Sequence, residues 1–553
     1  MNWFPLCNYT HYSLLKGFSQ PKELAKKCKN NDYKACGIAD YKSISGAVSF
    51  YSACIENNIK PIIGCSFDNF SLFAKNKNGW FDLIELVSSL DENDNLDTKF
   101  LNLICSKGNL ICVAKNELAS PVSKEDFYLK TDCFYDIYYV NQEDAQLHRI
   151  LLCSNMKTTL PKVYKKIKSG ENIENSKFFE NSDFYLKDNL EISEYIITDI
   201  ESGNIFNDIF NKCEEYSIFE KPKLPRFPTP KNESEEEYLT ELCRNGWRNL
   251  LAGTEKSNSE DKKKTYGNRF KKEFEVIKEA NLFGYFLIVW DIIKYANDNG
   301  WMTGPGRGSA SGCLISYLLG ITHVDPIEYD LLFERFYNSG RNTDDHISLP
   351  DIDMDVPADK RDEIISYLKD KYGQDNVCQM LTFGRLQGRS AIKEVLRVNE
   401  ACGFTEMNEI TKYIPDEAAI SDQLQEMDED EKSIIKWALI NESEYLKDFC
   451  FINKNGDLEG TYAEYFKQAI NIEGTFKTKG KHAAGVVISA NELYKVCPMV
   501  NQKNGKEKIA GLEMTDLELL GHVKFDVLGL SLLQKLMFID NIKKGETECL
   551  TGI

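Results

Sequence analysis

Three aspartates separated by single apolar residues have the clearest chemical potential in this sequence. Asp351, Asp353 and Asp355 lie in the segment LPDIDMDV at residues 349–356. Strict alternation has a period of two, so it predicts a half-buried β-strand with its apolar side chains toward a core and its carboxylates on the other face. Like charges on one short face repel unless a cation neutralises them, and carboxylate oxygens suit a hard divalent ion. The segment therefore predicts a Mg2+ site in which the acids bridge two ions.

Two other interpretations compete with a metal site at this segment. A calcium loop of the D-x-D-x-D-G type requires glycine where Val356 stands, and such a loop does not alternate acids with apolar residues. A solvated strand face that binds no ion stays open from these residues alone. The segment KFDVLGL at 524–530 favours the metal site, because it predicts a second strand with Lys524 and Asp526 on one face. Asp526 would supply the distant acid that a paired-carboxylate site requires.

A glycine-rich segment, GPGRGSASG at 304–312, precedes an apolar stretch that predicts a helix. Glycines allow a backbone to approach a ligand closely, and Ser309 together with the helix N-terminus offers donors to phosphate oxygens. A glycine-rich turn that only caps a helix explains the same residues, and the Walker pattern G-x-x-x-x-G-K-[ST] is absent. The segment is a candidate phosphate site with a structural alternative.

Basic residues recur every four positions at Arg385, Arg389, Lys393 and Arg397. If the stretch is helical, all four cations project from one face, which suits contacts with backbone phosphates. A solvated surface helix is the alternative. A second basic stretch, KTKGKH at 477–482, is predicted to be a turn that leads into a buried strand.

Two histidines near predicted strand starts, His482 and His522, could be metal ligands. Single histidines at such positions more often satisfy ordinary hydrogen bonds, so both interpretations stay open.

Alternating strands and helices predict how these segments are positioned. Strands are expected at 35–40 and 59–64 with a helix at 46–57 between them, which is the rhythm of a parallel sheet or barrel. Four prolines within 221–230 predict an extended segment between globular bodies. A helix is expected at 359–372, and residues 400–470 are expected to form an acidic helical lobe.

Composition limits the class of protein. The chain has 553 residues, 42% hydrophobic and 28% charged, which is typical of a folded protein with about two to four domains. Its net charge of −19 argues against nonspecific wrapping of nucleic acid, although a local basic groove depends on where charges lie. No apolar run approaches about 18 residues and the N-terminus lacks signal-peptide features, so we expect no membrane contact and a cytoplasmic location. The 17 cysteines include no C-x-x-C pair, which indicates buried reduced thiols.

Taken together, these segments resemble the C-family of bacterial replicative DNA polymerases, the polymerase III alpha subunits, over nearly the whole chain. The motifs that carry the resemblance are GPGRGSASG at 304–312, LLFERF at 331–336, LPDIDMD at 349–355, TFGRLQGR at 382–389, KHAAGVVIS at 481–489 and KFDVLGL at 524–530. It implies an α/β multidomain protein: a PHP-like distorted βα barrel, then a polymerase-beta-like nucleotidyltransferase palm with an inserted helical thumb. A short insertion at 342–346 departs from the family pattern.

The resemblance also implies roles for individual residues. The acids that hold two Mg2+ ions in the family correspond to Asp351, Asp353 and Asp526, while the role of Asp355 stays open. Residues expected at the incoming nucleotide are Arg307, Gly308, Ser309 and Arg335. Residues expected at DNA are Arg385, Arg389, Lys393, Arg397, Lys481 and His482.

The N-terminal region resembles the PHP domain of these polymerases, but its metal-ligand motifs are degraded. The matched positions hold Cys7, Tyr9, Asp40, Tyr41, Ser66, Asp136 and Tyr138. Histidines are lost at every matched position, and phenols with a pKa near about 10 are poor ligands at neutral pH. We therefore expect a structural, metal-free domain. The expected domains are a PHP-like domain at 1–220, a first palm part at 221–382, a thumb at 383–475, and a second palm part with the start of the fingers at 476–553.

The expected partners are primer-template DNA, dNTPs and a C-terminal polymerase chain. Family members continue well beyond the KFDVLGL motif, so we expect a second chain to supply fingers and clamp-binding regions, with a sliding clamp reached only through that chain. Its docking surface would be an apolar patch near Leu532, Leu533, Leu536, Met537 and Ile539. The tail around Cys549 resembles the opening of an intein, although a free terminal cysteine is commoner. A non-catalytic scaffold with this fold and a PHP-type phosphoesterase are the alternative functions.

Overall fold

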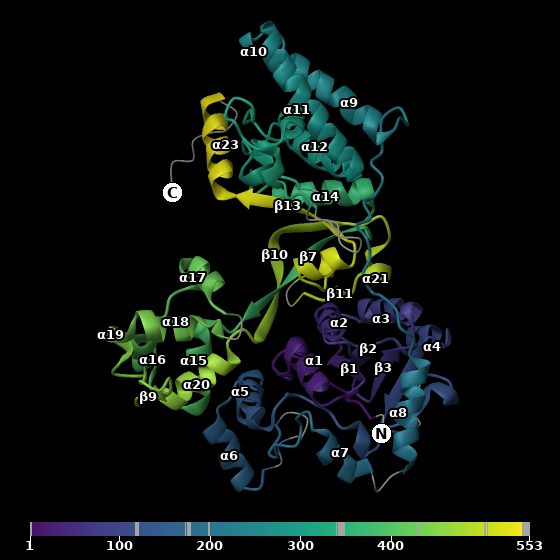
Figure 1. The fold of residues 1–553 in the computed structure, drawn as a ribbon, viewed down its shortest axis with the longest axis vertical. Coiled ribbons are helices and arrows are strands. Elements are labelled where there is room, and N and C mark those ends of the chain that lie inside the picture. The colour runs from purple at the N-terminus through teal and green to yellow at the C-terminus, as the bar shows by residue number, and fades with distance from the viewer. Residues whose placement is uncertain are drawn as a thin grey trace. The chain divides into compact units, whose positions relative to one another are not determined.

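The chain divides into two units, each built from two stretches of sequence (Figure 1). Unit 1 consists of residues 1–216 and 383–480, and unit 2 of residues 217–382 and 481–553. The computed structural model describes residues 3–116, 121–171, 173, 178–196, 200–338, 340, 349–428, 431–502, 505 and 507–544. The predicted insertion at 342–346 and the tail around Cys549 lie outside the described residues.

Unit 1 contains a five-stranded sheet in the order β1-β2-β3-β4-β5. Its strands are β1 (Ala35–Tyr41), β2 (Lys60–Ser66), β3 (Phe70–Ala74), β4 (Leu110–Ala114) and β5 (Phe127–Leu129). The outer pairs, β1/β2 and β4/β5, are parallel, while β3 is antiparallel to both of its neighbours. Every residue of β4 is buried, as expected for a short apolar strand covered on both faces. The predicted strands at 35–40 and 59–64 are confirmed, whereas closure into a barrel stays a prediction.

Helices of unit 1 come from both of its stretches. The first stretch supplies α1 (Pro21–Asn30), α2 (Ala47–Glu56), α3 (Lys77–Ser89), α4 (Thr98–Cys105), α5 (Ala145–Asn155), α6 (Leu160–Lys168), α7 (Asn189–Ile196) and α8 (Ile200–Lys212). The second supplies α15 (Gly388–Asn399), α16 (Phe404–Thr411), α17 (Ser421–Glu426), α18 (Ile434–Asn441), α19 (Ser443–Leu446) and α20 (Ala463–Ile472), with the hairpin β8 (Phe451–Ile452) and β9 (Leu458–Glu459).

The helical lobe of 383–480 shares one hydrophobic core with the first stretch of unit 1. Ile392 and Leu396 of α15 are fully buried in the same cluster as Ile150 and Leu151 of α5. The helices α16 to α20 confirm that residues 400–470 are largely helical, whereas their role as an inserted thumb stays a prediction. The lobe's common core with α5 could not be read from the sequence.

Unit 2 is organised around a six-stranded sheet in the order β11-β12-β7-β10-β13-β6. The strands are β6 (Asp353–Pro357), β7 (Val377–Arg385), β10 (Phe476–Ile488), β11 (Met499–Val500), β12 (Ile509–Ala510) and β13 (Val523–Leu530). The helices are α9 (Glu235–Gly246), α10 (Glu255–Asn258), α11 (Glu260–Glu279), α12 (Phe283–Asp298), α13 (Leu314–Leu318), α14 (Arg361–Tyr372), α21 (Leu493–Val496), α22 (Met514–Leu519) and α23 (Ser531–Lys544). Figure 1 shows β13 running directly into α23, both in yellow.

One face of this sheet packs on an apolar helix. Ile352, Met354 and Val356 are at most 1% exposed and share a core with α12 and with Phe525 of β13. Tyr285 of α12 stacks on Phe525 with 5.3 Å between ring centroids, and its hydroxyl accepts a hydrogen bond from the backbone N–H of Ile352 at 3.3 Å. Burial of each such side chain stabilises the fold by about 2 kcal/mol. The face that carries the acids is therefore fixed by the packing of the opposite face.

The proline-rich segment 221–230 forms no helix or strand, as expected. No cysteine of the described residues forms a disulfide, and all but Cys402 are buried, which agrees with the expected burial of the thiols. No helix in the described part of the chain is long and apolar enough to cross a membrane.

Candidate metal and nucleotide site

Two neighbouring strands of unit 2 bring three acids together. Strands β6 and β13 are parallel, and their register places Asp526 directly opposite Asp353. One carboxylate oxygen from each of Asp351, Asp353 and Asp526 lies within 4.8 Å of the others. Residues 173 positions apart in sequence thus meet in one cluster, which joins the two segments that the sequence singled out.

The expected alternation is confirmed, but the strand begins later than expected. Asp353 opens β6, so Leu349, Pro350 and Asp351 precede the strand. Proline has no N–H to give to a sheet, which is consistent with a strand that starts after Pro350. The side chain of Asp351 is 59% exposed, whereas that of Asp526 is 9% exposed. The cluster is open to solvent on the side of Asp351.

Two side-chain cations lie among the acids. Lys524 Nζ is 2.7 Å from Asp526 Oδ2 and 3.6 Å from Asp351 Oδ1. Arg307 Nη2 is 3.3 Å from Asp353 Oδ1, and its Nε is 3.2 Å from Asp355 Oδ1. Four carboxylates against two cations leave excess negative charge, which favours binding of divalent cations.

One carboxylate oxygen of the cluster also lacks a hydrogen-bond partner within the described part of the chain, which favours a bound metal ion. Asp526 Oδ1 is buried and has no hydrogen-bond partner among the described residues. A buried acceptor without a partner is costly, and a cation would satisfy it. The pKa of Asp353 is raised by partial burial and by Asp351, Asp526 and Asp355, while Arg307 lowers it. The donor set of carboxylate oxygens suits Mg2+.

Asp355 faces the glycine-rich segment rather than the cluster of three. Its backbone carbonyl accepts from Gly304 N at 3.0 Å, and its carboxylate holds Arg307. A Cβ on Gly304 would lie 2.7 Å from Asp355 Cβ, so only glycine fits this approach. The structure therefore separates Asp355 from the three acids that converge on one point.

The remaining nucleotide-site residues predicted from sequence lie on two segments of unit 2. Gly308 has φ +63° and opens a short 3-10 turn, Gly308–Gly312, immediately before α13. Ser309 is exposed on this turn, and Arg335 is exposed at the end of a second 3-10 turn, Phe333–Arg335. The apolar helix expected behind the glycine-rich segment is confirmed, although it spans only Leu314–Leu318.

The predicted row of DNA-binding cations is only partly helical. Arg385 lies at the end of β7, with its guanidinium 5.1 Å from the Phe476 ring centroid, so the prediction that all four residues share a helix is wrong for this one. The helix α15 starts at Gly388 because the chain must first leave the strand. Arg389, Lys393 and Arg397 do lie on α15.

The three cations of α15 also have protein partners. Arg389 Nη1 is 3.5 Å from Asp416 Oδ1, Lys393 donates to Asn408 Oδ1 at 2.9 Å, and Arg397 pairs with Glu394. Whether these residues contact DNA stays a prediction.

The basic stretch 477–482 is not a turn. It lies within the long strand β10, with Lys481 exposed and His482 half-buried, so that structural prediction is wrong. His482 Nδ1 accepts from Gly485 N at 2.8 Å, and His522 Nε2 donates to Val496 O at 3.2 Å. Burial lowers the pKa of His522 to about 4. Both histidines therefore make ordinary hydrogen bonds, which supports the structural interpretation over a ligand role.

Residues at the degraded motif positions of unit 1 bind one another. The Tyr9 and Ser66 hydroxyls are 2.9 Å apart, and Tyr9 stacks on Tyr138 with 4.6 Å between centroids. Asp136 is paired with Lys130. These residues line a cavity of about 1130 Å3, together with Tyr41.

The two other matched positions of unit 1 are buried. Asp40 accepts from Thr10 N and Thr10 Oγ1, both at 2.7 Å, and from Ser13 Oγ at 2.6 Å. Burial raises the pKa of Asp40 to about 6 and that of Cys7 to about 12, so the thiol stays protonated at neutral pH. A metal-free unit 1 stays a prediction.

Three residues near the site were missed by sequence reasoning. Tyr285 supports the acidic strand from α12, and Arg269 and Glu273 of α11 contact the end of the glycine-rich segment. The only sequence signal for the last two is an Arg and a Glu four residues apart on a predicted helix, which is common on surfaces. The burial of Glu273 and the contacts of Arg269 could not be foreseen.

Comparison with known proteins places these findings in a family. A family model described as "Bacterial DNA polymerase III alpha NTPase domain" matches residues 237–529, and a "PHP domain" model matches residues 6–286. DNA polymerase III subunit alpha of Buchnera aphidicola (Acyrthosiphon pisum) is 31% identical, over 94% of this chain and 47% of the relative. That of Bacillus subtilis is 30% identical, over 96% and 48%, and that of Borreliella burgdorferi 31%, over 97% and 49%. The chain spans about half the length of these curated relatives.

Proposed function

The chain belongs to the family of bacterial DNA polymerase III alpha subunits, and we propose that it carries the nucleotidyl-transfer site of a DNA-directed DNA polymerase. The observation that carries this proposal is the convergence of Asp351, Asp353 and Asp526 on one point. Arg307, which precedes Gly308, contacts Asp353 of this cluster. Phosphoryl transfer requires a metal-binding group of carboxylates beside a segment that can bind phosphate, because its catalysis depends on positioning and on neutralising charge.

In this proposal each residue has a defined task. Asp351, Asp353 and Asp526 would hold two Mg2+ ions, and the buried Asp526 Oδ1 would be available as a ligand atom. Bound Mg2+ would supply the positive charge that lowers the pKa of a primer 3′-hydroxyl and neutralises the leaving pyrophosphate. Gly308 and Ser309 present donors to the triphosphate of a dNTP, and Arg335 adds charge from the second segment.

Arg307 belongs to the glycine-rich segment and contacts two of the acids. Its guanidinium is 49% exposed and lies within 3.3 Å of both Asp353 and Asp355. We infer that Asp355 is not a metal ligand but holds Arg307 in the proposed triphosphate-binding segment, and that a cation bound at Asp353 would compete with Arg307 for this carboxylate.

The parts of the molecule follow from this function. The six-stranded sheet of unit 2 would be a palm, the helices of 383–475 a thumb, and residues 1–220 a structural PHP-like domain without metal, in a cytoplasmic protein. The degraded motif positions, filled by hydroxyls and by the Lys130–Asp136 pair, support the absence of metal chemistry there. Residues 221–382 and 476–553 would together complete the palm and begin the fingers.

Helix α23 supports the proposal that further polypeptide completes the enzyme. Its described residues include no buried one, and Leu532, Leu536, Phe538 and Ile539 are between 40% and 65% exposed. Leu533 and Met537 are half-buried, so the apolar surface differs slightly from the patch expected from sequence. We propose that fingers, and through them the clamp contacts, cover this face, supplied by a C-terminal polymerase chain.

Primer extension tests the proposed activity. With Mg2+, primer-template DNA, dNTPs and the C-terminal polymerase region added, the chain should extend primers. Asp526→Asn should reduce the rate of primer extension by about 10³-fold or more, because it removes a buried carboxylate from the proposed metal site that β6 and β13 form together. Asp362→Asn, 89% exposed on α14 of the same unit, is the matched control and should extend primers normally. Activity that survives in Asp526→Asn would refute the site assignment.

The DNA-binding residues need a separate test. If Arg389, Lys393 and Arg397 contact phosphates, replacing all three by alanine should weaken DNA binding for any sequence and reduce the salt slope by about one unit per contact. An unchanged slope would leave these residues as the intramolecular partners of Asp416, Asn408 and Glu394.

A further inference from the structure

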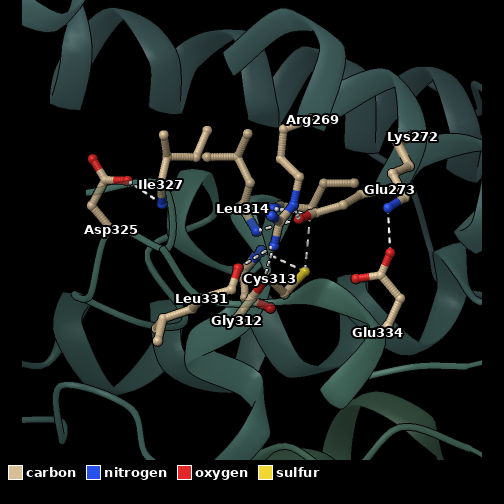
Figure 2. Close-up of polar contacts among 12 residues, drawn as sticks. Arg269, Lys272, Glu273, Gly312, Cys313, Leu314, Asp325, Ile327, Leu331 and Glu334 are labelled. Carbon is tan, nitrogen blue, oxygen red and sulfur yellow. Dashed lines mark hydrogen bonds and ion pairs between the residues drawn. The ribbon is translucent and has the colours of Figure 1, made fainter. Parts of the chain in front are cut away.

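Helix α11 carries an ion pair between the partly buried Arg269 and the buried Glu273, and it contacts both candidate nucleotide-binding segments (Figure 2). Arg269 Nε donates to Glu273 Oε1 at 2.6 Å, one helical turn away. Arg269 Nη2 donates to Gly312 O at 2.6 Å and to Leu331 O at 2.9 Å. Gly312 ends the glycine-rich segment and Leu331 begins the segment that carries Arg335. One guanidinium therefore joins the two segments by direct hydrogen bonds.

Glu273 fixes the structure that follows the glycine-rich segment. Its carboxylate is fully buried and accepts from Leu314 N and Ile315 N, both at 3.0 Å, and from the Cys313 thiol at 3.4 Å. These amides belong to the first turn of α13, which would otherwise leave them without acceptors. Burial raises the pKa of Glu273, whereas the two amides and Arg269 lower it. The carboxylate is thus matched by donors on every oxygen.

A second ion pair connects the same face of α11 to the segment that carries Arg335. Lys272 forms an ion pair with Glu334, which immediately precedes Arg335. Both side chains are about half exposed, so this pair contributes little to stability. It does restrict the position of the turn Phe333–Arg335 relative to α11.

The Arg269–Glu273 pair contributes more to the geometry of the two segments than to the free energy of unfolding. A buried ion pair costs several kcal/mol of desolvation, and apolar residues of similar volume are often at least as stabilising. What apolar residues cannot do is bind Gly312 O, Leu331 O and two backbone amides at fixed distances. The pair therefore adds directed hydrogen bonds between two loops that also lie close together, since a Cβ on Gly312 would lie 2.8 Å from Leu332 O.

We propose that Arg269 and Glu273 are positioning residues for the triphosphate: they hold Gly308–Gly312 and Arg335 at the separation that a bound dNTP requires. This inference rests on the proposed function, because it assumes that both segments contact the nucleotide. It assigns the pair no contact with the nucleotide or with metal. A preorganised site loses less free energy on ordering its loops when the ligand binds.

The test is equilibrium binding of dATP in Ca2+ with primer-template DNA, measured by calorimetry on the full chain with the C-terminal polymerase region added. Arg269→Met should weaken dATP binding by about tenfold or more, and Arg269→Lys, which keeps the charge but cannot span three acceptors, should weaken it nearly as much. Lys271→Ala, exposed on the same helix and outside these contacts, is the matched control and should bind as the wild type does.

Two further readouts separate a positioning role from general destabilisation. Hydrogen exchange at the amides of Leu314 and Ile315 should accelerate in Glu273→Gln, which has one oxygen fewer to accept from them. Mn2+ affinity at the three aspartates should stay within about twofold of wild type in all variants, because the acids lie on β13, on β6 and directly before β6.

The outcomes distinguish this inference from the proposed function. Wild-type affinity for dATP in a folded Arg269→Met variant would overturn the positioning role alone. Parallel loss of dATP and Mn2+ binding would overturn it too, because that result indicates collapse of the unit. Absence of dATP binding in the wild type would overturn the proposed nucleotide site itself, and the inference with it.

Discussion

The acidic site of unit 2 and the cavity of unit 1 arrange charged side chains in opposite ways. In unit 2, four carboxylates share Lys524 and Arg307, so negative charge is left in excess. In unit 1, Asp136 has its own partner in Lys130, and the neighbouring matched positions carry the uncharged hydroxyls of Tyr9 and Ser66. Excess negative charge creates a need for cations, whereas a neutral, internally bonded set does not.

The comparison also shows what distinguishes a binding site from a set of polar residues. Asp526 Oδ1 is buried without a partner among the described residues, while Asp40 of unit 1 accepts three hydrogen bonds. Unsatisfied acceptors on a rigid sheet are unfavourable until a ligand arrives. Satisfied ones stabilise the fold as it stands.

The largest expected effect is on the free energy of unfolding, when the lysine that pairs with an acid in each region is replaced by methionine. Lys524→Met should destabilise the metal-free protein by about 3 kcal/mol, because Asp526 would remain buried without its partner. Mg2+ should restore most of that loss, since an ion can take the place of the ammonium group. Lys130→Met should cost about 2 kcal/mol, because its pair is more exposed, and Mg2+ should restore none of it. Urea unfolding with and without Mg2+ measures the stability of both variants. If Mg2+ restored the stability of both variants equally, the proposed difference between the two regions would be wrong.

A smaller and more local contrast separates neighbouring acids of one strand. Asp353→Asn should weaken Mn2+ binding by about 100-fold, because it removes a charged ligand atom from the cluster. Asp355→Asn should change Mn2+ affinity by no more than about threefold and weaken dATP binding by about tenfold, because Arg307 loses its anchor. Mn2+ titration followed by electron paramagnetic resonance and dATP calorimetry give the two numbers. Equal loss of Mn2+ in both variants would make Asp355 a ligand.

The smallest effect is a dependence on pH. The pKa of Asp353 in the metal-free protein is raised by burial and by neighbouring acids, so folding favours its protonated form. The stability this contributes is fully present below the ordinary pKa of aspartate and is lost as the pH rises through the raised value. The melting temperature measured without metal should therefore decline as the pH rises through that range. Mg2+ should abolish this decline, and Asp353→Asn should flatten it. A decline that persists unchanged in Asp353→Asn would assign it to other groups.

Local sequence patterns are sufficient to predict the faces of the site's strands. The alternation at 352–356 identifies which side chains enter the core, because the pleat of a strand fixes opposite directions for neighbours. The same logic places Lys524 and Asp526 together on β13. What the alternation does not fix is the start of the strand, which Pro350 delays.

The spacing of basic residues gave a wrong structural prediction where a strand changes to a helix within one motif. Arg385 keeps the four-residue interval of Arg389 and Lys393 but lies in β7, because an interval says nothing about where a helix begins. The basic residues 477–481 resemble a turn in composition, yet they extend β10. Lys477 there pairs with Glu394 of α15 at 2.7 Å, a contact that local reading cannot supply.

Long-range pairing was not predictable for a simple reason. Arg269 meets Gly312 across 43 residues, and Arg307 meets Asp355 across 48. Such contacts depend on how α11, α13 and β6 pack, and packing is decided by shape and burial rather than by sequence intervals. The family resemblance supplied the match between the acids, but it carried no information on these supporting residues.

The central claim is that Asp351, Asp353 and Asp526 form the divalent-metal site of this chain and that the N-terminal cavity does not. Electron paramagnetic resonance of Mn2+ titrated into the wild type, Asp526→Asn and Asp136→Asn tests it most directly. We predict about two bound Mn2+ ions in the wild type and in Asp136→Asn, and loss of that binding in Asp526→Asn. Binding that survives in Asp526→Asn, or that is lost in Asp136→Asn, would contradict the account.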